Sequence, residues 1–117
     1  MEEVEEIIGL LDKVRERNLL VVVEGLKDRR SLEKLGITNI LTLKKPLYAV
    51  VEEIASKAEE VVLLTDLDLE GKKLYRVLSI DLQKHGVKIN NALRELLFKS
   101  SLRQIEGLAA FLSRAQA

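Results

Sequence analysis

Two short groups of acidic residues stand where apolar runs of the chain end, and they are the residues best suited to chemistry. The first is Glu24, which follows the apolar run 19–23. The second is the pair Asp66 and Asp68, which follows the run 61–65. Carboxylates two residues apart on an extended chain point to the same side, and hard divalent cations such as Mg²⁺ take oxygen ligands of this kind. The pattern therefore indicates a metal site suited to phosphate chemistry.

Each of these acids also has a structural interpretation, in which it caps or begins a helix. Asp28 is placed to cap one helix, and Asp66 or Asp68 can cap the next. Glu70 can then interact with the dipole of that second helix. For the first group alone this structural interpretation is the stronger one. For the second group, counted with Glu70, it accounts for one or two of the three acids, which favours a metal site.

The composition excludes most other kinds of metal site and nucleophile. The chain has no cysteine and one histidine, His85. Disulfides and thiolate sites are therefore excluded, and zinc has almost no ligands to use. His85 precedes Gly86, where a contact with the C-terminal end of a helix is the simpler interpretation. A metal in this protein must be held by oxygen.

Helices and strands are predicted to alternate along the chain. Apolar residues recur at helical spacing over 2–17, 28–35, 46–57, 74–86, 93–97 and 102–112, with a break at 100–101. Short apolar runs predict strands over 19–23, 39–43, 61–65 and 87–89. This order is typical of an α/β fold with a four-stranded, mostly parallel sheet and right-handed crossovers. Such sheets bind ligands at the carboxyl ends of their strands, where the acids stand.

Single residues mark several helix ends. Gly36 and Gly86 are placed to terminate the helices that precede them. Pro46, the only proline, suits the first turn of the helix that follows it. These residues support the predicted order of elements.

The length and composition predict one domain. The chain has 117 residues, of which 47% are hydrophobic and 32% are charged, as in a soluble globular protein. We expect a single domain over 1–117, with its core at about 19–89, an N-terminal helix and C-terminal helices. The longest apolar run, 19–23, is far shorter than the roughly 20 residues of a membrane span. The first residues are acidic and unlike a secretion signal, so we expect a cytoplasmic protein that does not bind membranes.

The charges balance overall but not along the chain. Nineteen basic residues stand against 19 acidic ones, so the formal net charge is zero. The first twelve residues contain five acids and no base, whereas residues 84–117 contain six Lys or Arg and two acids. Binding to a polyanion would therefore need a local basic patch, and solvated helix faces are the commoner cause of such a split.

The two acidic groups, taken together and in this order, resemble the motifs of the Toprim family. One apolar strand ends in Glu-Gly with an aspartate three residues later, and about forty residues on another ends in Asp-x-Asp-x-x-Gly. The matching residues are Glu24, Gly25 and Asp28, then Asp66, Asp68 and Gly71. The resemblance spans about 19–89. This family includes the catalytic cores of topoisomerases and bacterial-type primases, and small nucleases resembling the 5S ribosomal RNA maturation enzyme.

The resemblance implies a role for each acid. Glu24 would be a general acid or base that also contacts the metal, while Asp66 and Asp68 would bind Mg²⁺ or Mn²⁺. Asp28 and Glu70 would support them. The resemblance also implies a Rossmann-like, three-layer Toprim fold. The first and third strands must be neighbours for the acids to converge, so we expect the sheet order 2-1-3-4.

Glycines and basic residues beside the acidic groups are candidates for binding phosphate. They lie at predicted helix N-termini, where phosphate is favoured, and they are Gly25, Lys27, Arg29, Gly71, Lys72, Lys73 and Arg76. Lys27 is the strongest single candidate and is also a candidate catalytic residue. Taken singly, these basic residues are more simply explained as exposed helix residues that pair with acids such as Glu33 or Glu70. Many Toprim relatives have proline in place of Leu67, which leaves the fine specificity open.

Two functions remain open from the sequence. The first is a Mg²⁺-dependent nuclease acting on structured RNA or DNA. The alternative is a non-catalytic module that binds nucleic acid or a protein partner. Tyr48 and Tyr75 lie in helical stripes, unlike the attacking tyrosine of topoisomerases, and the cysteine-rich module of many primases is absent. With four aromatic residues, no platform for stacked bases is indicated, so binding to the backbone and shape of nucleic acid is expected.

Overall fold

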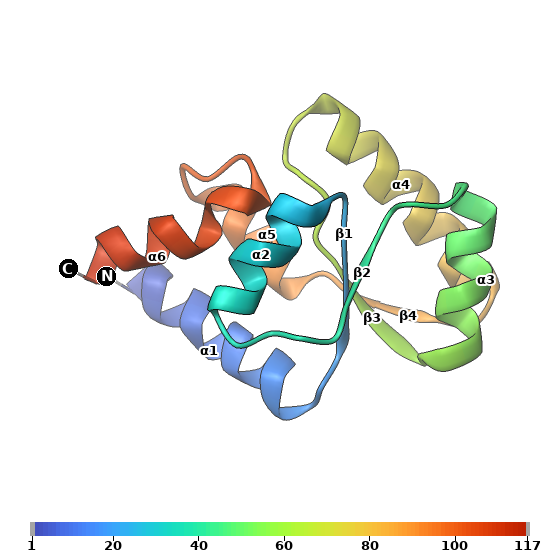
Figure 1. Ribbon diagram of the computed structural model, residues 1–117, viewed down its shortest axis with the longest axis horizontal. Coiled ribbons are helices and arrows are strands. Elements are labelled where there is room, and N and C mark those ends of the chain that lie inside the picture. Colours follow the sequence, from blue (N-terminus) through green and yellow to red (C-terminus); the bar gives the residue numbers. More distant parts are fainter. Residues whose placement is uncertain (1, 117) are drawn as a thin grey trace.

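Four parallel strands form the centre of the computed structural model, which describes residues 2–116 (Figure 1). The strands are β1 (Leu20–Val23), β2 (Ile40–Thr42), β3 (Glu60–Leu63) and β4 (Lys88–Asn90). The helices are α1 (Glu2–Glu16), α2 (Leu26–Lys34), α3 (Leu47–Lys57), α4 (Leu69–Lys84), α5 (Ala92–Lys99) and α6 (Leu108–Gln116), with a 3₁₀ turn η1 (Ile105–Gly107) before α6. Strands and helices therefore alternate through the first ninety residues, as predicted.

The strands lie in the order β2-β1-β3-β4, which confirms the predicted sheet. All three pairings are parallel, so the sheet is wholly rather than mostly parallel. Val21 pairs with Ile40 on one side and Val62 on the other. This register places the carboxyl ends of β1 and β3 side by side.

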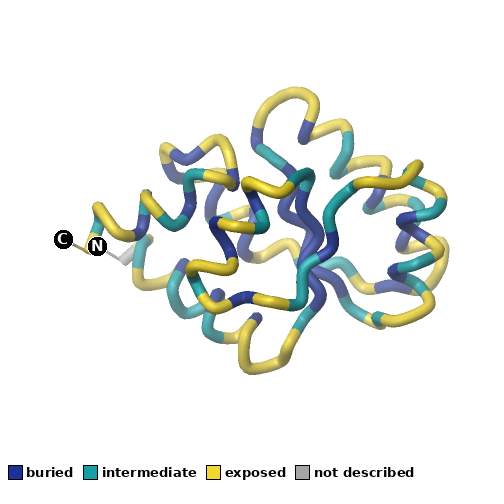
Figure 2. The backbone as a smooth tube through the Cα atoms, viewed as in Figure 1, coloured by how far each residue is buried: buried dark blue, intermediate teal, exposed yellow. Residues whose placement is uncertain are grey.

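Helices cover both faces of the sheet and complete three layers. On one face lie α1, α2, α5 and α6, and on the other lie α3 and α4 (Figure 1). Successive residues of β1 alternate between the two cores: Val21 and Val23 belong to the first, Leu20 and Val22 to the second. Figure 2 shows the two central strands, β1 and β3, as deeply buried, whereas the edge strands β2 and β4 are more exposed. Burial on both faces explains why the central strands β1 and β3 belong to continuous apolar runs.

The start of α2 differs from the prediction. The helix begins at Leu26, two residues before the predicted start, because Gly25 rather than Asp28 is its N-cap. Asp28 lies in the first turn, where its Oδ2 accepts a hydrogen bond from the Gly25 backbone N–H at 3.0 Å. The predicted cap was therefore wrong, but the same carboxylate satisfies the backbone from inside the helix.

Other helix ends agree closely with the prediction. Pro46 is the N-cap of α3, immediately before its first turn, and α3 ends at Lys57. Gly36 and Gly86 have positive φ angles of 82° and 79° just beyond α2 and α4, a conformation that favours glycine at helix ends. The His85 ring Nδ1 lies 2.9 Å from the carbonyl oxygen of Asp81, in the last turn of α4. The expected contact at the end of that helix is thus present.

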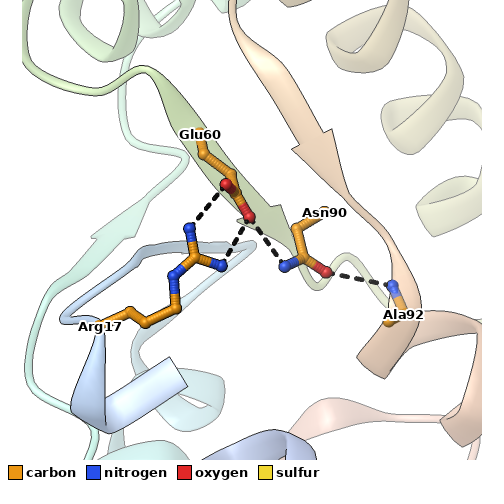
Figure 3. A network of polar contacts seen from close by, with 4 residues as sticks. All are labelled: Arg17, Glu60, Asn90 and Ala92. Atoms are coloured by element: carbon orange, nitrogen blue, oxygen red, sulfur yellow. Dashed lines mark hydrogen bonds and ion pairs between the residues drawn. The ribbon is translucent and has the colours of Figure 1, made fainter. Parts of the chain in front are cut away.

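A polar network joins the first residue of β3 to its surroundings (Figure 3). The two carboxylate oxygens of Glu60 accept hydrogen bonds from the Arg17 guanidinium at 2.8 and 3.2 Å. Glu60 Oε2 also accepts from the Asn90 side chain at 2.9 Å, and Asn90 Oδ1 accepts from the Ala92 backbone N–H at 3.3 Å. This network lies where β3 begins, at the amino edge of the sheet. In the described range 2–116, no helix is long and apolar enough to cross a membrane.

Candidate metal and phosphate site

The structure brings the two acidic groups together at the carboxyl edge of the sheet. Glu24 follows β1 and Asp66 follows β3, and these strands are neighbours. Glu24 Oε2 accepts a hydrogen bond from the Asp66 backbone N–H at 2.6 Å. Residues 42 positions apart in the chain therefore meet in one site.

Asp66 and Asp68 are each held through one carboxylate oxygen. Asp66 Oδ1 accepts from the Ile105 backbone N–H at 2.8 Å, and Asp68 Oδ1 accepts from the Gly71 backbone N–H at 2.8 Å as the N-cap of α4. Across residues 2–116 the structure shows no hydrogen bond to either Oδ2. Each aspartate is thus fixed by one oxygen and can offer the other to a ligand.

The pKa values of three carboxyls in this site are raised. Burial is the main cause for Glu24, and the charges of Asp66, Asp68 and Asp28 add to it. Burial also raises the pKa of Asp28, which is 6% exposed, and that of Asp66. Hydrogen bonds from backbone N–H groups oppose these shifts without cancelling them. The site therefore concentrates negative charge in partly buried surroundings.

Among residues 2–116, no basic group neutralises this charge by a direct ion pair. All ion pairs found among residues 2–116 lie elsewhere. A cation that entered the site would relieve the mutual repulsion of the carboxylates. The charge distribution alone thus favours a metal ion or another cationic group.

The donor set fits Mg²⁺ with few protein ligands. Within residues 2–116, no group of three or more His, Cys, Asp or Glu side chains is arranged to hold a metal ion. Mg²⁺ needs no such cage, because it keeps several waters and is usually held by one or two carboxylates together with substrate phosphate. The free oxygens of Asp66 and Asp68 suit this mode of binding.

Gly71 supports the site by close backbone packing. A Cβ atom at this position would lie 2.0 Å from the carbonyl oxygen of Asp66, so only glycine fits. The Gly71 carbonyl accepts from Thr65 Oγ1 at 2.7 Å, and its N–H is taken by Asp68. Gly71 thus fixes the first turn of α4 against the chain at Asp66, and its N–H is already occupied.

Arg94 of α5 is a site residue that the motif analysis missed. Its side chain donates from Nε to the Thr65 carbonyl at 3.3 Å and from Nη2 to the Asp66 carbonyl at 3.2 Å. It is 8% exposed and lies over the Tyr75 ring, 4.2 Å from its centroid. Burial lowers the pKa of Arg94, while the nearby charge of Glu24 opposes that effect. No local sequence pattern could identify it, because its partners lie 28 and 29 residues away.

The segment after α5 also holds the site in place. The Leu67 backbone N–H donates to the Arg103 carbonyl at 2.9 Å, and Ile105 donates to Asp66 as described above. A proline at position 67, as in many Toprim relatives, could not make the first of these bonds. The loop that carries Asp66 and Asp68 is therefore attached to the C-terminal part of the chain.

The predicted phosphate-binding residues have different surroundings. Lys27, Lys72, Lys73 and Arg76 are exposed, as is Glu70, which was predicted as a supporting acid. Gly25 has open space where a side chain would stand. Arg29 instead lies 3.4 Å from Glu33, the pairing expected for an ordinary helix residue. Lys72 Nζ lies 4.8 Å from the centroid of the Phe98 ring. Lys27 and Lys72 follow directly on the two acidic groups and remain the candidates nearest to them in the chain.

Comparison with known proteins gives a consistent result. A family model described as the Toprim domain matches residues 19–103. Toprim domains generally bind Mg²⁺ and act on nucleic acids. The match ends before η1 and α6, so the segment containing Ile105 lies beyond it.

Several archaeal proteins are similar to this chain along most of their length. A UPF0292 protein of Methanocaldococcus jannaschii is 34% identical over 97% of this chain and 92% of its own. A UPF0292 protein of Pyrococcus furiosus is 39% identical over 86% of this chain and 77% of its own. A solved structure of an Aquifex aeolicus protein is 32% identical, with a TM-score of 0.78, and the match covers 87% of this chain and 94% of that one.

Proposed function

The chain belongs to the Toprim domain family, and from that premise we propose that it is a small Mg²⁺-dependent nuclease that hydrolyses phosphodiester bonds of structured RNA or DNA. One observation carries the proposal. Glu24 and Asp66 meet at the carboxyl edge of a parallel sheet, with Glu24 Oε2 2.6 Å from the Asp66 backbone nitrogen. Partly buried carboxylates without a described ion-pair partner destabilise a fold, so their convergence at one edge of the sheet favours a catalytic purpose.

In this proposal Asp66 and Asp68 hold the metal through their free oxygens. When bound, Mg²⁺ would offset negative charge on the phosphate and help to orient the attacking water. The backbone bonds from Ile105 and Gly71 keep both carboxylates in place before the metal arrives. Such preorganisation reduces the rearrangement needed at the moment of reaction.

Glu24 is proposed as the general acid or base, and it also lies close enough to contribute to the metal's surroundings. Its raised pKa brings proton exchange closer to neutral pH. It would accept a proton from the attacking water or return one to the leaving oxygen. Asp28 and Glu70 are proposed as supporting acids. Asp28 adds negative charge beside Glu24 and fixes the Gly25 turn.

Basic residues in the first halves of α2 and α4 are proposed to bind phosphate. Lys27 follows Gly25 and is the one proposed to contact the reacting phosphate. Those proposed for flanking phosphates are Arg29, Lys72, Lys73 and Arg76, and Gly25 leaves room for the backbone of a substrate to approach. Phosphate binding of this kind would weaken as salt concentration rises.

A cleavage assay tests the proposal. Labelled structured RNA, duplex DNA and single-stranded DNA are incubated with Mg²⁺ or Mn²⁺ and the wild-type protein. The Asp66→Asn variant should lose cleavage by at least about 100-fold. Glu59→Gln is the matched control, because Glu59 is an exposed carboxylate just before β3, at the opposite edge of the sheet. Cleavage that survives in Asp66→Asn would contradict the assignment of the metal ligands.

A binding measurement separates the catalytic proposal from the alternative. Mg²⁺ should raise the melting temperature of the wild-type protein and should raise that of Asp66→Asn less, because a ligand bound only by the folded state stabilises it. If Mg²⁺ and nucleic acid bind but no substrate is cut, the chain is a non-catalytic Toprim module for nucleic acid or a protein partner. If neither Mg²⁺ nor Mn²⁺ binds, both functions are wrong as stated.

A further inference from the structure

A groove of about 400 Å³ opens directly beside Asp68, where the segment 101–107 meets α6. Asp68 and Glu106 line it together with Arg103, Gln104, Phe111 and Arg114. The volume is that of a typical small-ligand site, which generally measures roughly 300–1,000 Å³. Most of these residues lie beyond the part of the chain that matches the Toprim family model.

A second hollow continues this groove along α6. Its volume is about 740 Å³, and it shares Ser101, Phe111 and Arg114 with the first. Lys99 lines it farther on. Because the two hollows share three lining residues, they adjoin and are treated as one track that starts at Asp68. Figure 1 shows α6, which carries Phe111 and Arg114, leading away from the sheet. The residues Lys99, Ser101, Arg103, Phe111 and Arg114 are called the C-terminal track below. A track of this kind suits an extended chain better than a compact small molecule.

The basic side chains of the C-terminal track can bind phosphates. The two hollows carry three bases, Lys99, Arg103 and Arg114, and three acids, Glu3, Asp68 and Glu106. Within residues 2–116 none of the three bases forms an ion pair with a carboxylate, so no direct contact neutralises them. Arg103 uses Nη1 for the carbonyls of Ser100 and Leu102, both at 2.8 Å, which fixes its guanidinium at the groove. Guanidinium groups held in this way bind phosphate well because several N–H donors lie in one plane.

Phe111 adds a surface for a base. It is half-buried against the core of α1, α5 and α6, and its remaining surface lines both hollows. A base stacked on an aromatic side chain gains roughly 1–3 kcal/mol, with little dependence on sequence. Bases in a duplex are already stacked and paired, so only an unpaired nucleotide can use this surface.

We propose that the C-terminal track binds a single strand of nucleic acid next to the proposed metal site, with phosphates at Arg103 and Arg114 and one unpaired base against Phe111. The inference rests on the proposed function, because the strand in the track is the one whose phosphodiester bond reaches Asp66 and Asp68. It narrows the substrate class to nucleic acids that are single-stranded on one side of the cut.

Binding without metal tests this proposal separately from cleavage. A labelled 12-nucleotide single strand is titrated with the protein in EDTA, at several salt concentrations. Arg114→Gln should weaken binding about threefold, and the slope of log affinity against log salt should fall by about 0.7, the value for one lost phosphate contact on a single strand. Lys84→Gln is the matched control, since it removes the same charge at the far end of α4.

A base-specific test uses abasic nucleotides. A single abasic nucleotide is placed at each position of the strand in turn. At the position whose base stacks on Phe111, it should lower the affinity of the wild-type protein about tenfold. The same oligonucleotide should bind Phe111→Leu no more weakly than the unmodified one does, because the stacking partner is already gone. Phe111→Leu keeps an apolar side chain against the core, and its melting curve shows whether the fold is intact.

Each outcome bears on one claim. If Arg114→Gln binds the single strand as Lys84→Gln does, or if no abasic nucleotide lowers the affinity, the proposed binding to the C-terminal track is wrong. This holds even when the wild-type protein cleaves its substrate. If duplex DNA binds as tightly as the single strand and loses as much affinity in Arg114→Gln, the restriction to single strands is wrong. If the salt slope falls as expected but no substrate is cut in Mg²⁺, the track stands and the nuclease function fails.

Discussion

The carboxylates at the two edges of the same sheet have opposite surroundings. At the amino edge, Glu60 is paired with Arg17 and Asn90, and these partners lower its pKa. At the carboxyl edge, burial and mutual repulsion raise the pKa values of Glu24 and Asp66. All three residues are carboxylates, and Glu60 and Asp66 stand at opposite ends of the same strand, β3. Only at the amino edge does a basic side chain pair with the carboxylate.

This difference separates structural from functional acids. A paired acid such as Glu60 lowers the energy of the fold, if only slightly, because its partner Arg17 is largely exposed to water. Unpaired and partly buried acids raise it, since the charged form is poorly solvated. Proteins generally tolerate such a cost where a ligand later removes it. The contrast between the edges is therefore a stronger sign of function than an acidic cluster alone.

The largest expected effect is on cleavage. On a substrate that the wild-type protein cuts, Glu24→Gln should lower the rate constant by about 10²- to 10⁴-fold, because the proposed acid or base is lost while an oxygen remains to accept the Asp66 N–H. Glu60→Gln at the amino edge should leave the rate within about twofold of wild type. Single-turnover rates at saturating protein measure both. Equal losses in the two variants would remove the functional distinction between the edges.

The next effect is on stability at Gly71. The substitution Gly71→Ala should lower the free energy of unfolding by about 3 kcal/mol, because its Cβ would lie 2.0 Å from the Asp66 carbonyl oxygen. Gly9→Ala is the matched control: it lies in α1 with no atom within 4 Å of the new Cβ, and it should raise stability by about 1 kcal/mol. Urea unfolding measures both variants. A neutral Gly71→Ala would mean that the carboxyl edge is less tightly packed than described.

Loss of Arg94 should have a somewhat smaller effect. Arg94→Met leaves the carbonyls of Thr65 and Asp66 without their donors, which should lower the free energy of unfolding by about 2 kcal/mol. Arg17→Met at the amino edge should have a much smaller effect, because the Arg17 side chain is 54% exposed and its pair is screened by water. Equal losses in urea unfolding would show that burial does not distinguish the two arginines.

The smallest effect is that of pH. For Glu24, Asp28 and Asp66 the folded-state pKa lies above the unfolded value, so the folded protein holds more protons between the two values. Their contribution to stability is therefore fully present below about pH 4 and is lost as pH rises through the folded-state pKa values. Asp28→Asn keeps an oxygen for the Gly25 N–H and should raise the free energy of unfolding at pH 7 by about 1 kcal/mol.

Two controls sharpen this pH prediction. Mg²⁺ should offset the loss at pH 7, because it binds the folded state and neutralises the same carboxylates. Glu60→Gln should act in the opposite direction, since the lowered pKa of Glu60 contributes stability that is present above the unfolded value and lost as pH falls. Thermal unfolding from pH 4 to pH 8 measures these slopes. If stability depends on pH equally steeply in the wild-type protein and in Asp28→Asn, the role given to the acids of the carboxyl edge is wrong.

Much of the fold could be predicted because its signals are local. Apolar runs such as 19–23 mark strands buried on both faces, and residues such as Gly86 mark helix ends by their backbone conformation. The neighbouring positions of β1 and β3 followed from the requirement that the acids converge. The start of α2 was wrong because Asp28 was interpreted as the cap, whereas its carboxylate acts three residues inside the helix boundary.

The rest of the site could not be predicted because its contacts are long-range. Arg94 and Ile105 reach Asp66 from α5 and η1, across 28 and 39 residues, and neither belongs to a recognisable motif. The four aromatic residues in the sequence predicted no platform for stacked bases. The base-binding role proposed for Phe111 depends instead on its place with Arg114 in a groove next to Asp68, which no sequence pattern reveals. The spacing of residues in a helix shows which face they share, but not which distant segment covers that face.

The sequence by itself determined the order of elements and the residue types at the carboxyl edge, because hydrophobic periodicity and strand-end acids are properties of neighbouring residues. The tertiary structure decided which of those acids meet, which backbone N–H groups hold them, and that Glu60 is neutralised while Glu24 is not. The physical reason is that burial and electrostatic interaction depend on distance in space, and in a parallel sheet the nearest charges come from segments far apart in the chain.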